Sequence, residues 1–510
     1  MNTLIKVYFV FIGLRFLKKN KDLSFNNLNF KKLDFSNYKL IRSFIFKKNF
    51  HEINSKYVNN FDFLNFSEIL GGKIGISLSR QSIFGWHQLN KNKIFYPWSE
   101  DLTSKRLINM IYNYDFINSS SSIVEKKMLN KIILYHMHRV LFDFKRKKID
   151  QISSYDLIAS TLTLLILKKN YEKYISYINQ VIDKQIDGFG MHKSYNLVEH
   201  TKFLNNLYEL KNILLYFNTK VPSKIENKIL IMNSTLNEYF HSDGTIPLFN
   251  GGNNNYTHII QESINKESYM KSRDFKGIYN GIAFFSDKNK KLFFDVVQPN
   301  NNSISKNLSA GTLSIEFSCS GEKIISNCGA SESSGKNPEY LRYSAAHSTI
   351  ILQNTNISEI KEGNPHIKYP QSVTFELNND DKKYVYEGSH NGYQKKFSKI
   401  VKRKVTNIRG SDILVGEDSI LSITKNNLKV IYHIRFHLVS GIVFNFTNNR
   451  KNIILRTKFN NMWIFKSDVE LIVEDSIIVD RNTTVETKQI VIKGITNKNK
   501  VIRKWSLEKI

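Results

Sequence analysis

Histidine and tyrosine side chains lie beside turn signals at several places in the sequence, and both residue types transfer protons in general acid–base catalysis. His192 and Tyr195 follow the run Asp-Gly-Phe-Gly at residues 187–190, between two stretches of helical pattern. We therefore expect a loop or the start of a helix to present them. The alternative for this segment is a polar cap on the helix that follows.

Two further segments supply candidate contacts for a substrate. Asn250 lies in residues 243–252, which form another loop between helical stretches. Arg342 and His347 lie just before a strand-like run, and the small residues that precede His347 permit close approach of another group. A hydrogen-bonded structural histidine is the open alternative at position 347.

His390 and Tyr393 flank an Asn-Gly step, which marks a tight turn and would set both side chains at the end of a strand. Arg403 follows this segment. Turn formation alone is the alternative role for His390 and Tyr393.

The segment Arg-Phe-His-Leu at residues 435–438 lies within a strand-like run. Side chains alternate between the two faces of a strand, so Arg435 and His437 share one face and Phe436 lies on the other. A solvated polar face is the alternative interpretation of this pair.

The elements that must position these residues change in kind near residue 280. Before it, apolar residues recur at helical spacing; one stripe (Ile225, Ile229, Met232, Leu236 and Phe240) opens just after the helix-start signal Pro-Ser. After it, short alternating runs separated by turn residues predict strands. The pattern predicts a two-domain α+β protein, with an antiparallel helical array followed by a large antiparallel β-sandwich. We expect an N-terminal extension over residues 1–75, a helical domain over 76–280 and the sandwich over 281–510.

Composition narrows the functional classes. Hydrophobic residues make up 41% of the 510 residues, which excludes a disordered chain. The net charge of +29 accompanies a high content of Lys, Asn and Ile, which an AT-rich coding bias would produce. A polyanionic partner is the functional alternative, and the scarcity of arginine and of nucleic-acid modules disfavours nucleic acid.

The two cysteines, Cys319 and Cys328, are too few for a disulfide framework. We interpret both as buried thiols.

The N-terminal segment has an amphipathic pattern. Leu4, Val7, Phe11 and Leu14 fall at helical spacing, and the apolar run is far shorter than the roughly 20 residues that span a bilayer. We expect residues 4–19 to form a helix that lies on the body of the protein or contacts a membrane surface.

Taken in order, these segments resemble the heparinase II/III-like proteins, particularly their alphaproteobacterial branch. The resemblance runs from about residue 80 to the C-terminus. The segments that carry it are DGFGMHKS (187–194), DGTIPLFNGG (243–252), GTLSIEFS (311–318), SNCGA (326–330), RYSAAHSTIIL (342–352), HNGY (390–393), GED (416–418), RFHL (435–438), VEDS (473–476), QIV (489–491) and Trp505.

The resemblance implies an incomplete α/α toroid followed by a β-sandwich, and lyase chemistry on an acidic, uronate-containing polysaccharide. In β-elimination, donors neutralise the uronate carboxylate, a base removes the C5 proton and an acid protonates the departing O4. On this reading His390 or Tyr393 is the base, and His192 and Tyr195 are further catalytic candidates. The expected substrate contacts are Asn250, Arg342, His347, Arg403, Arg435 and His437, with Arg435 as the carboxylate partner.

The sequence also departs from the family pattern. The catalytic Tyr-His pair of classical members matches Leu197 and Val198 here, and Tyr195 is displaced from it by two residues. His136 and His138 lie near the place of an upstream Asn-His pair, within a helical stretch. The His, Asp and His that hold zinc in many members match Ser309, Asn327 and His347. We therefore expect no metal and no other cofactor.

The prediction is a polysaccharide lyase of the cell envelope or periplasm. The alternative function is a non-catalytic protein that binds a glycan or assembles envelope polysaccharide on the same fold. The alternative locations are the cytoplasm and the membrane periphery.

Overall fold

The computed structural model describes residues 56–93, 95–98, 101–264, 281–286, 289–300, 304, 308–331, 338–361, 364–424, 428–480 and 483–510. The amphipathic helix predicted over residues 4–19 lies outside these residues. Within the described ranges, none of the helices combines the length and the hydrophobicity that crossing a bilayer requires.

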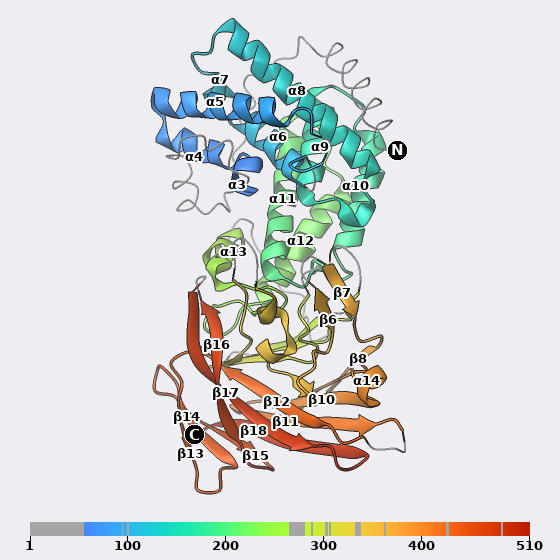
Figure 1. Ribbon diagram of the computed structural model, residues 1–510, viewed down its shortest axis with the longest axis vertical. Coiled ribbons are helices and arrows are strands. Elements are labelled where there is room, and N and C mark those ends of the chain that lie inside the picture. Colours follow the sequence, from blue (N-terminus) through green and yellow to red (C-terminus); the bar gives the residue numbers. More distant parts are fainter. Residues whose placement is uncertain are drawn as a thin grey trace. The chain divides into compact units, whose positions relative to one another are not determined.

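Helices fill the first half of the described chain (Figure 1). Their bounds are α3 (Lys56–Asn59), α4 (Phe63–Leu70), α5 (Gly72–Asn90), α6 (Leu102–Tyr112), α7 (Tyr114–Asn118), α8 (Ile123–Arg146), α9 (Ser154–Ile166), α10 (Glu172–Gln185), α11 (Leu197–Tyr216), α12 (Ser223–Glu238) and α13 (Thr257–Ile264). Helix α12 begins directly after Pro222, as the start signal predicts.

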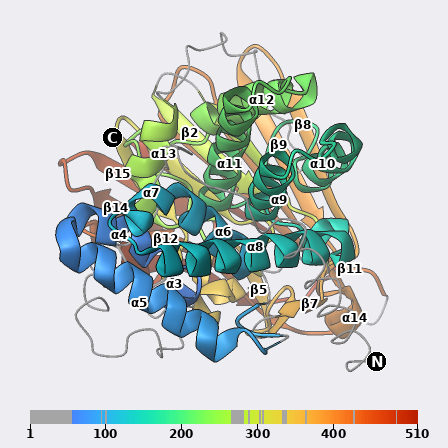
Figure 2. The same ribbon diagram turned by 90° about the horizontal axis from the view of Figure 1, so that it is seen from above.

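Local sequence explains where these helices begin and how they pack. Ser122 and Glu125 form a reciprocal capping box at the start of α8, and Ser153 and Asp156 do the same for α9. Helices α6, α8 and α9 contact one another (Figure 2). Nearly every side chain of α9 is buried, because its apolar residues surround the helix.

The second half forms two antiparallel sheets. Sheet one has the order β1-β2-β3-β4-β12-β17-β16, with β5 paired to β12, and sheet two has the order β13-β14-β15-β18-β11-β10-β9-β8. The bounds are β1 (Ile282–Ser286), β2 (Lys290–Asp295), β3 (Ile315–Cys319), β4 (Glu322–Ser326), β5 (Ile350–Leu352), β8 (Val373–Asn379), β9 (Lys383–His390), β10 (Lys399–Ile408), β11 (Ile413–Ser422), β12 (Ile431–Leu438), β13 (Val443–Phe446), β14 (Asn452–Arg456), β15 (Met462–Ser467), β16 (Ile472–Asp480), β17 (Thr483–Ile495) and β18 (Lys500–Lys509). A separate hairpin joins β6 (Glu359–Lys361) to β7 (Asn364–Lys368).

The two sheets enclose an aromatic core. Phe436 of sheet one contacts Phe465 and Trp505 of sheet two, with ring centroids 5.0 and 4.7 Å apart. Such contacts stabilise a core beyond the burial of apolar area. Phe436 faces this core while Arg435 and His437 make polar contacts on the other face, which confirms the alternation predicted for β12. The α+β fold class, with a helical part followed by a β-sandwich, is likewise confirmed.

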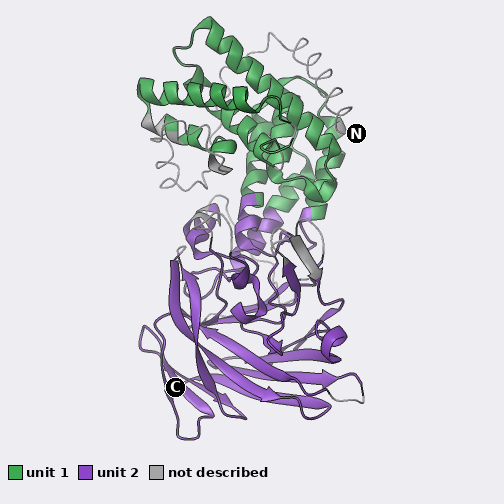
Figure 3. Ribbon diagram, in the orientation of Figure 1, with its two compact units in different colours: residues 1–184, 203–229 green, residues 185–202, 230–510 purple. Residues whose placement is uncertain are grey.

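The compact units are divided differently from the sequence patterns (Figure 3). The first unit runs to residue 184 and includes residues 203–229, and the second comprises residues 185–202 and 230–510. Long-range bonds explain why the loop between α12 and α13 belongs to the second unit: Tyr239 donates to the Ile282 carbonyl over 2.7 Å, and His241 is bonded to Ser318 over 2.9 Å. The predicted boundaries at residues 75 and 280 remain predictions from sequence pattern.

Candidate functional site

Several loops of the second unit meet on the face of sheet one that points away from the sandwich core. We call residues 187–196, 241–252, 308–312 and 342–349 the loop cluster. Asn196 Nδ2 donates to the Asn250 carbonyl over 3.0 Å. The Ser309 amide donates to Asn250 Oδ1 over 3.0 Å, and the Ala310 amide donates to the Arg342 carbonyl over 2.8 Å. The fold thus gathers segments that lie far apart in the sequence.

Asn250 sits at a strained turn that aims its amide into the cluster. Its φ of 51° is left-handed, a region that Asn tolerates better than most residues. Gly252 follows because a Cβ there would lie 2.6 Å from the Pro247 carbonyl oxygen. The Asn250 side chain is buried, and its Nδ2 has no hydrogen-bond partner among the described residues. That nitrogen can donate to a carboxylate or a sugar hydroxyl.

His347 is the histidine of the cluster whose ring has the most unused bonding capacity. It is buried, and its ring packs on Gly311, where a Cβ would lie 2.9 Å from His347 Cγ. Neither ring nitrogen has a hydrogen-bond partner in the described part of the chain. Burial lowers the pKa of His347 to about 4, so the imidazole is neutral near neutral pH. A neutral imidazole can accept a proton.

His437 and Arg435 extend the cluster along β12. His437 Nδ1 is bonded to Ser476 Oγ over 2.7 Å, and burial lowers the pKa of His437 to about 3. Arg435 Nη1 donates to Glu474 over 2.7 Å and to Gln489 over 3.1 Å. Glu474 therefore compensates much of the positive charge of Arg435, the residue that was predicted to neutralise a substrate carboxylate.

Arg342 and Arg403, both expected to contact substrate, are bonded to the protein itself. Arg342 Nη2 donates to the Leu308 carbonyl over 2.9 Å, which holds two loops of the cluster together. Arg403 is fully buried and makes a bidentate pair with Asp418, at 2.7 and 3.0 Å. Its Nη1 donates to the carbonyls of Leu313 and Ser348. The geometry thus favours a structural role for Arg403, and the substrate contact stays a prediction.

His192 and Tyr195 both lie in the loop cluster, but they differ in burial. His192 Nδ1 is bonded to Ser194 over 2.7 Å and Nε2 to Gln185 over 3.4 Å, and burial lowers its pKa to about 4. Both ring nitrogens are therefore engaged. Tyr195 is half-buried at a left-handed φ of 50°. Burial raises the pKa of Tyr195, and the charges of Asp187 and Asp295 raise it further, so the phenol keeps its proton.

Tyr195 also borders a small pocket. The pocket's volume is about 10 Å³, close to the space that one water molecule needs. The residues that line it are Met191, Tyr195, Leu197, Tyr239, Pro247, Phe249 and Ile282.

His390 and Tyr393, the residues expected to supply the base, lie in the sandwich core. Tyr393 is 1% exposed, and its hydroxyl donates to the Thr355 carbonyl over 3.0 Å. His390 is equally buried, and its Nδ1 accepts the Gly392 amide over 3.1 Å. The tight turn is present, but both side chains face the sandwich core. This core position argues against the predicted catalytic role.

His136, from the helical half, is also a core residue. Arg106 Nε donates to His136 Nε2 over 3.2 Å, and the guanidinium lies 4.1 Å from the Trp86 ring centroid. Aromatic faces stabilise such a buried cation. Burial lowers the pKa of His138, the second histidine of this helix, to about 4.

The residues at the family's metal positions do not fit a zinc ion. Asn327 Nδ2 donates to Glu316 over 2.9 Å, and Asn327 Oδ1 accepts the Ser348 amide over 2.9 Å. The hydroxyl of Ser309 is not one of the usual zinc ligands. His347 is therefore the single strong zinc ligand among the three positions. Across the ranges that the structure describes, no three His, Cys, Asp or Glu side chains are placed to hold a metal together.

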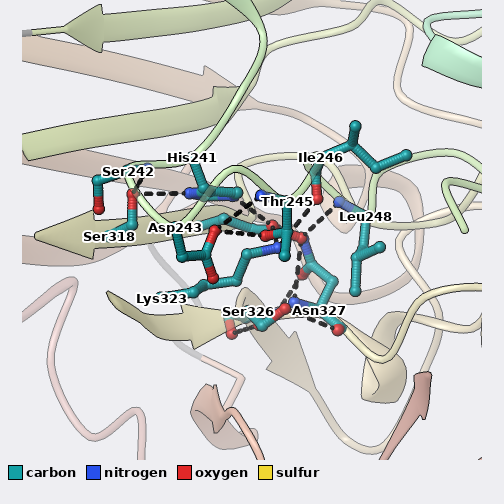
Figure 4. A network of polar contacts seen from close by, with 12 residues as sticks. His241, Ser242, Asp243, Thr245, Ile246, Leu248, Ser318, Lys323, Ser326 and Asn327 are labelled. Carbon is teal, nitrogen blue, oxygen red and sulfur yellow. Dashed lines mark hydrogen bonds and ion pairs between the residues drawn. The ribbon is translucent and has the colours of Figure 1, made fainter. Parts of the chain in front are cut away.

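Glu316 is the central polar residue that the sequence patterns did not single out. It is buried in β3 and bonded to His241, Lys323 and Asn327, three residues that Figure 4 labels. The sequence does carry a signal for this residue, because Glu316 stands between Ile315 and Phe317 in an apolar strand. A charge buried in such a strand requires partners.

Both cysteines are buried, as expected, and burial raises the pKa of Cys328 to about 12.

Solved structures of other proteins share this architecture. The helical part followed by a two-sheet sandwich is the fold of solved polysaccharide lyases. A structure of heparinase III shares 13% identity at a TM-score of 0.73, covering 96% of this chain and 87% of that one. A heparan sulfate lyase, HepC from Pedobacter heparinus, shares 12% identity at a TM-score of 0.64, covering 99% and 88%. At these identities the likeness shows the fold.

The sequence also matches a family model over its second half. Residues 270–506 match the family model described as heparinase II/III-like, C-terminal. The resemblance drawn from the ordered motifs is thereby confirmed. A search of curated proteins found no match.

Proposed function

We propose that the protein is a polysaccharide lyase that cleaves an acidic, uronate-containing glycan by β-elimination at the loop cluster. The heparinase-like fold supports lyase chemistry at the level of the family. The net charge of +29 suits a polyanionic chain.

The proposed chemistry assigns three chemical roles and one orienting role to the described residues. Asn250 Nδ2 donates to the uronate carboxylate, which makes the C5 proton more acidic. The neutral His347 ring accepts that proton. Tyr195, whose raised pKa keeps its proton in place, protonates the departing O4. Arg342, which joins the loops around Asn250, orients the cluster.

The observation that carries the proposal is the unused bonding capacity at Asn250 and His347. Buried polar groups are ordinarily satisfied within a protein. Here an amide nitrogen and both nitrogens of a neutral imidazole lack partners among the described residues, on loops that the fold brings together. A polar substrate group would satisfy them.

The test is ultraviolet absorbance during incubation with a panel of uronate polysaccharides, because elimination creates a C4–C5 double bond conjugated to the carboxylate. We expect absorbance to rise with at least one glycan. H347Q should lower kcat by about 10²–10⁴-fold, the usual contribution of a general base. The control is H258Q, since His258 is exposed on α13. Unchanged turnover in H347Q would overturn the assignment of the base.

The alternative function is a non-catalytic protein that binds a glycan or assembles envelope polysaccharide. The burial of His347 and the small pocket beside Tyr195 favour it, because neither offers room for a sugar ring without movement. A flat absorbance trace on a glycan that the protein binds in calorimetry would support this alternative.

A further inference from the structure

A buried ion pair fastens the loop that carries Asn250 to sheet one. We call His241, Glu316, Lys323 and Asn327 the Glu316 cluster (Figure 4). Glu316 Oε1 accepts the Leu248 amide and Asn327 Nδ2, each over 2.9 Å. Glu316 Oε2 is bonded to His241 over 2.9 Å and lies 3.3 Å from Lys323 Nζ.

Lys323 and His241 supply further bonds between this loop and sheet one. Lys323 Nζ also donates to the Ile246 carbonyl over 2.9 Å. His241 Nδ1 is bonded to Ser318 Oγ over 2.9 Å, and that oxygen accepts the Ser242 amide over 3.0 Å. The loop is thus joined to strands β3 and β4 by side chains and by its own backbone.

The charges of the cluster balance. Burial would raise the pKa of Glu316, but Lys323 and the bond from His241 lower it to about 2, so the carboxylate is ionised. Burial and the charge of Lys323 lower the pKa of His241 to about 4, so this ring is neutral. A neutral His241 that donates from Nε2 to Glu316 accepts at Nδ1 from Ser318. One anion therefore faces one cation.

The same geometry excludes a carboxylate at position 327. Asn327 donates from Nδ2 to Glu316 over 2.9 Å, so an aspartate there would set a second anion against the first. Like charges at that distance in a buried site are strongly destabilising.

We propose that the Glu316 cluster is a metal-independent clamp that positions the Asn250 loop, with the Lys323 ammonium supplying the positive charge that balances the Glu316 carboxylate. The positioning of Asn250 as a substrate contact rests on the proposed function; the clamp itself does not. Glu316 and Lys323 are positioning residues, since neither is assigned to substrate.

The first experiment is hydrogen exchange on the full chain, comparing E316Q with wild type. Glutamine keeps the size of the side chain and removes the charge, which leaves Lys323 uncompensated. We expect amide exchange in residues 241–252 to rise by about tenfold or more, while exchange in β9, β10 and β11 stays unchanged. E387Q, at a half-exposed residue of β9, should change neither region.

The ion pair of Glu316 and Lys323 also predicts how substitutions at these two positions combine. The double variant E316Q/K323Q removes both charges, so it should protect residues 241–252 better than E316Q alone. This arm keeps the test decisive if E316Q fails to fold. Equal exchange in wild type and E316Q, or a double variant in which residues 241–252 exchange faster than in E316Q, would overturn the clamp.

The second experiment tests independence from metal without an activity assay. Chelation should leave the Tm of wild type unchanged, and purified protein should contain far less than one zinc per chain. Added zinc should likewise leave the Tm of wild type unchanged. A Tm that falls on chelation, or zinc at one per chain, would refute metal independence. Loss of the proposed lyase activity in every assay would leave both of these readouts standing.

Discussion

The side-chain amide of Asn196 donates a hydrogen bond to the backbone carbonyl of Asn250 over 3.0 Å, joining two loops separated by 54 residues. The same Asn196 side chain accepts the Val198 amide over 2.8 Å and so caps the start of α11. One residue therefore fixes both the beginning of a helix and the turn that presents a candidate substrate contact.

The substitution N196D separates these two functions. Aspartate keeps the accepting oxygen of the cap and removes the donor to Asn250. We expect helix α11 to persist and glycan affinity to fall by about tenfold, the usual worth of one hydrogen bond. Calorimetric titration with an acidic glycan measures the affinity, and circular dichroism checks the helix. Equal affinity in wild type and N196D would show that this bond does not position Asn250.

The hydroxyl of Tyr393 should matter for stability and leave catalysis unchanged. Y393F removes the bond to the Thr355 carbonyl in the core, so unfolding in urea should require about 1 kcal/mol less free energy. Turnover per folded molecule should stay at the wild-type value. A folded Y393F protein with no turnover would restore the sequence hypothesis that Tyr393 is the base.

Arg403 should act as part of the core. R403K keeps the positive charge but cannot reproduce the bidentate pair with Asp418, so we expect a loss of roughly 1.5–3 kcal/mol in unfolding free energy, the worth of a hydrogen bond to a charged group. The control is K488Q at the exposed pair of Lys488 and Asp475, where surface pairs contribute about 0–1 kcal/mol. If R403K keeps full stability and loses glycan affinity, the predicted substrate contact is correct.

Asp295 should give stability a specific dependence on pH. Burial raises its pKa from 3.8 to about 7, so between these values the folded state holds a proton that the unfolded state has lost. Stability contributed at this site therefore falls as pH rises from about 4 to about 7. D295N keeps the acceptor for the Val297 amide and removes the titration.

The measurement is the difference in urea unfolding free energy between D295N and wild type. That difference should grow in favour of D295N by roughly 4 kcal/mol between the two pH values, the equivalent of the pKa shift. Parallel pH curves for the two proteins would contradict the raised pKa.

The sequence by itself determined the kinds of elements and their order. Helical spacing placed α12, alternation put Arg435 and His437 opposite Phe436, and ordered motifs identified the family, because these signals depend on residues close together in the chain. Period-two alternation, however, assigns a strand residue to a face without saying what covers that face.

Only the tertiary structure decided which polar residues lie in the sandwich core and which lie in the loop cluster. Tyr393 and His347 both follow turn-forming or small residues, yet one lies in the sandwich core and the other in the loop cluster. The partners of Glu316 were also inaccessible to sequence patterns, because His241 and Glu316 are 75 residues apart and meet through the packing of a loop on a sheet. Burial and charge pairing depend on such long-range contacts, and local sequence does not encode them.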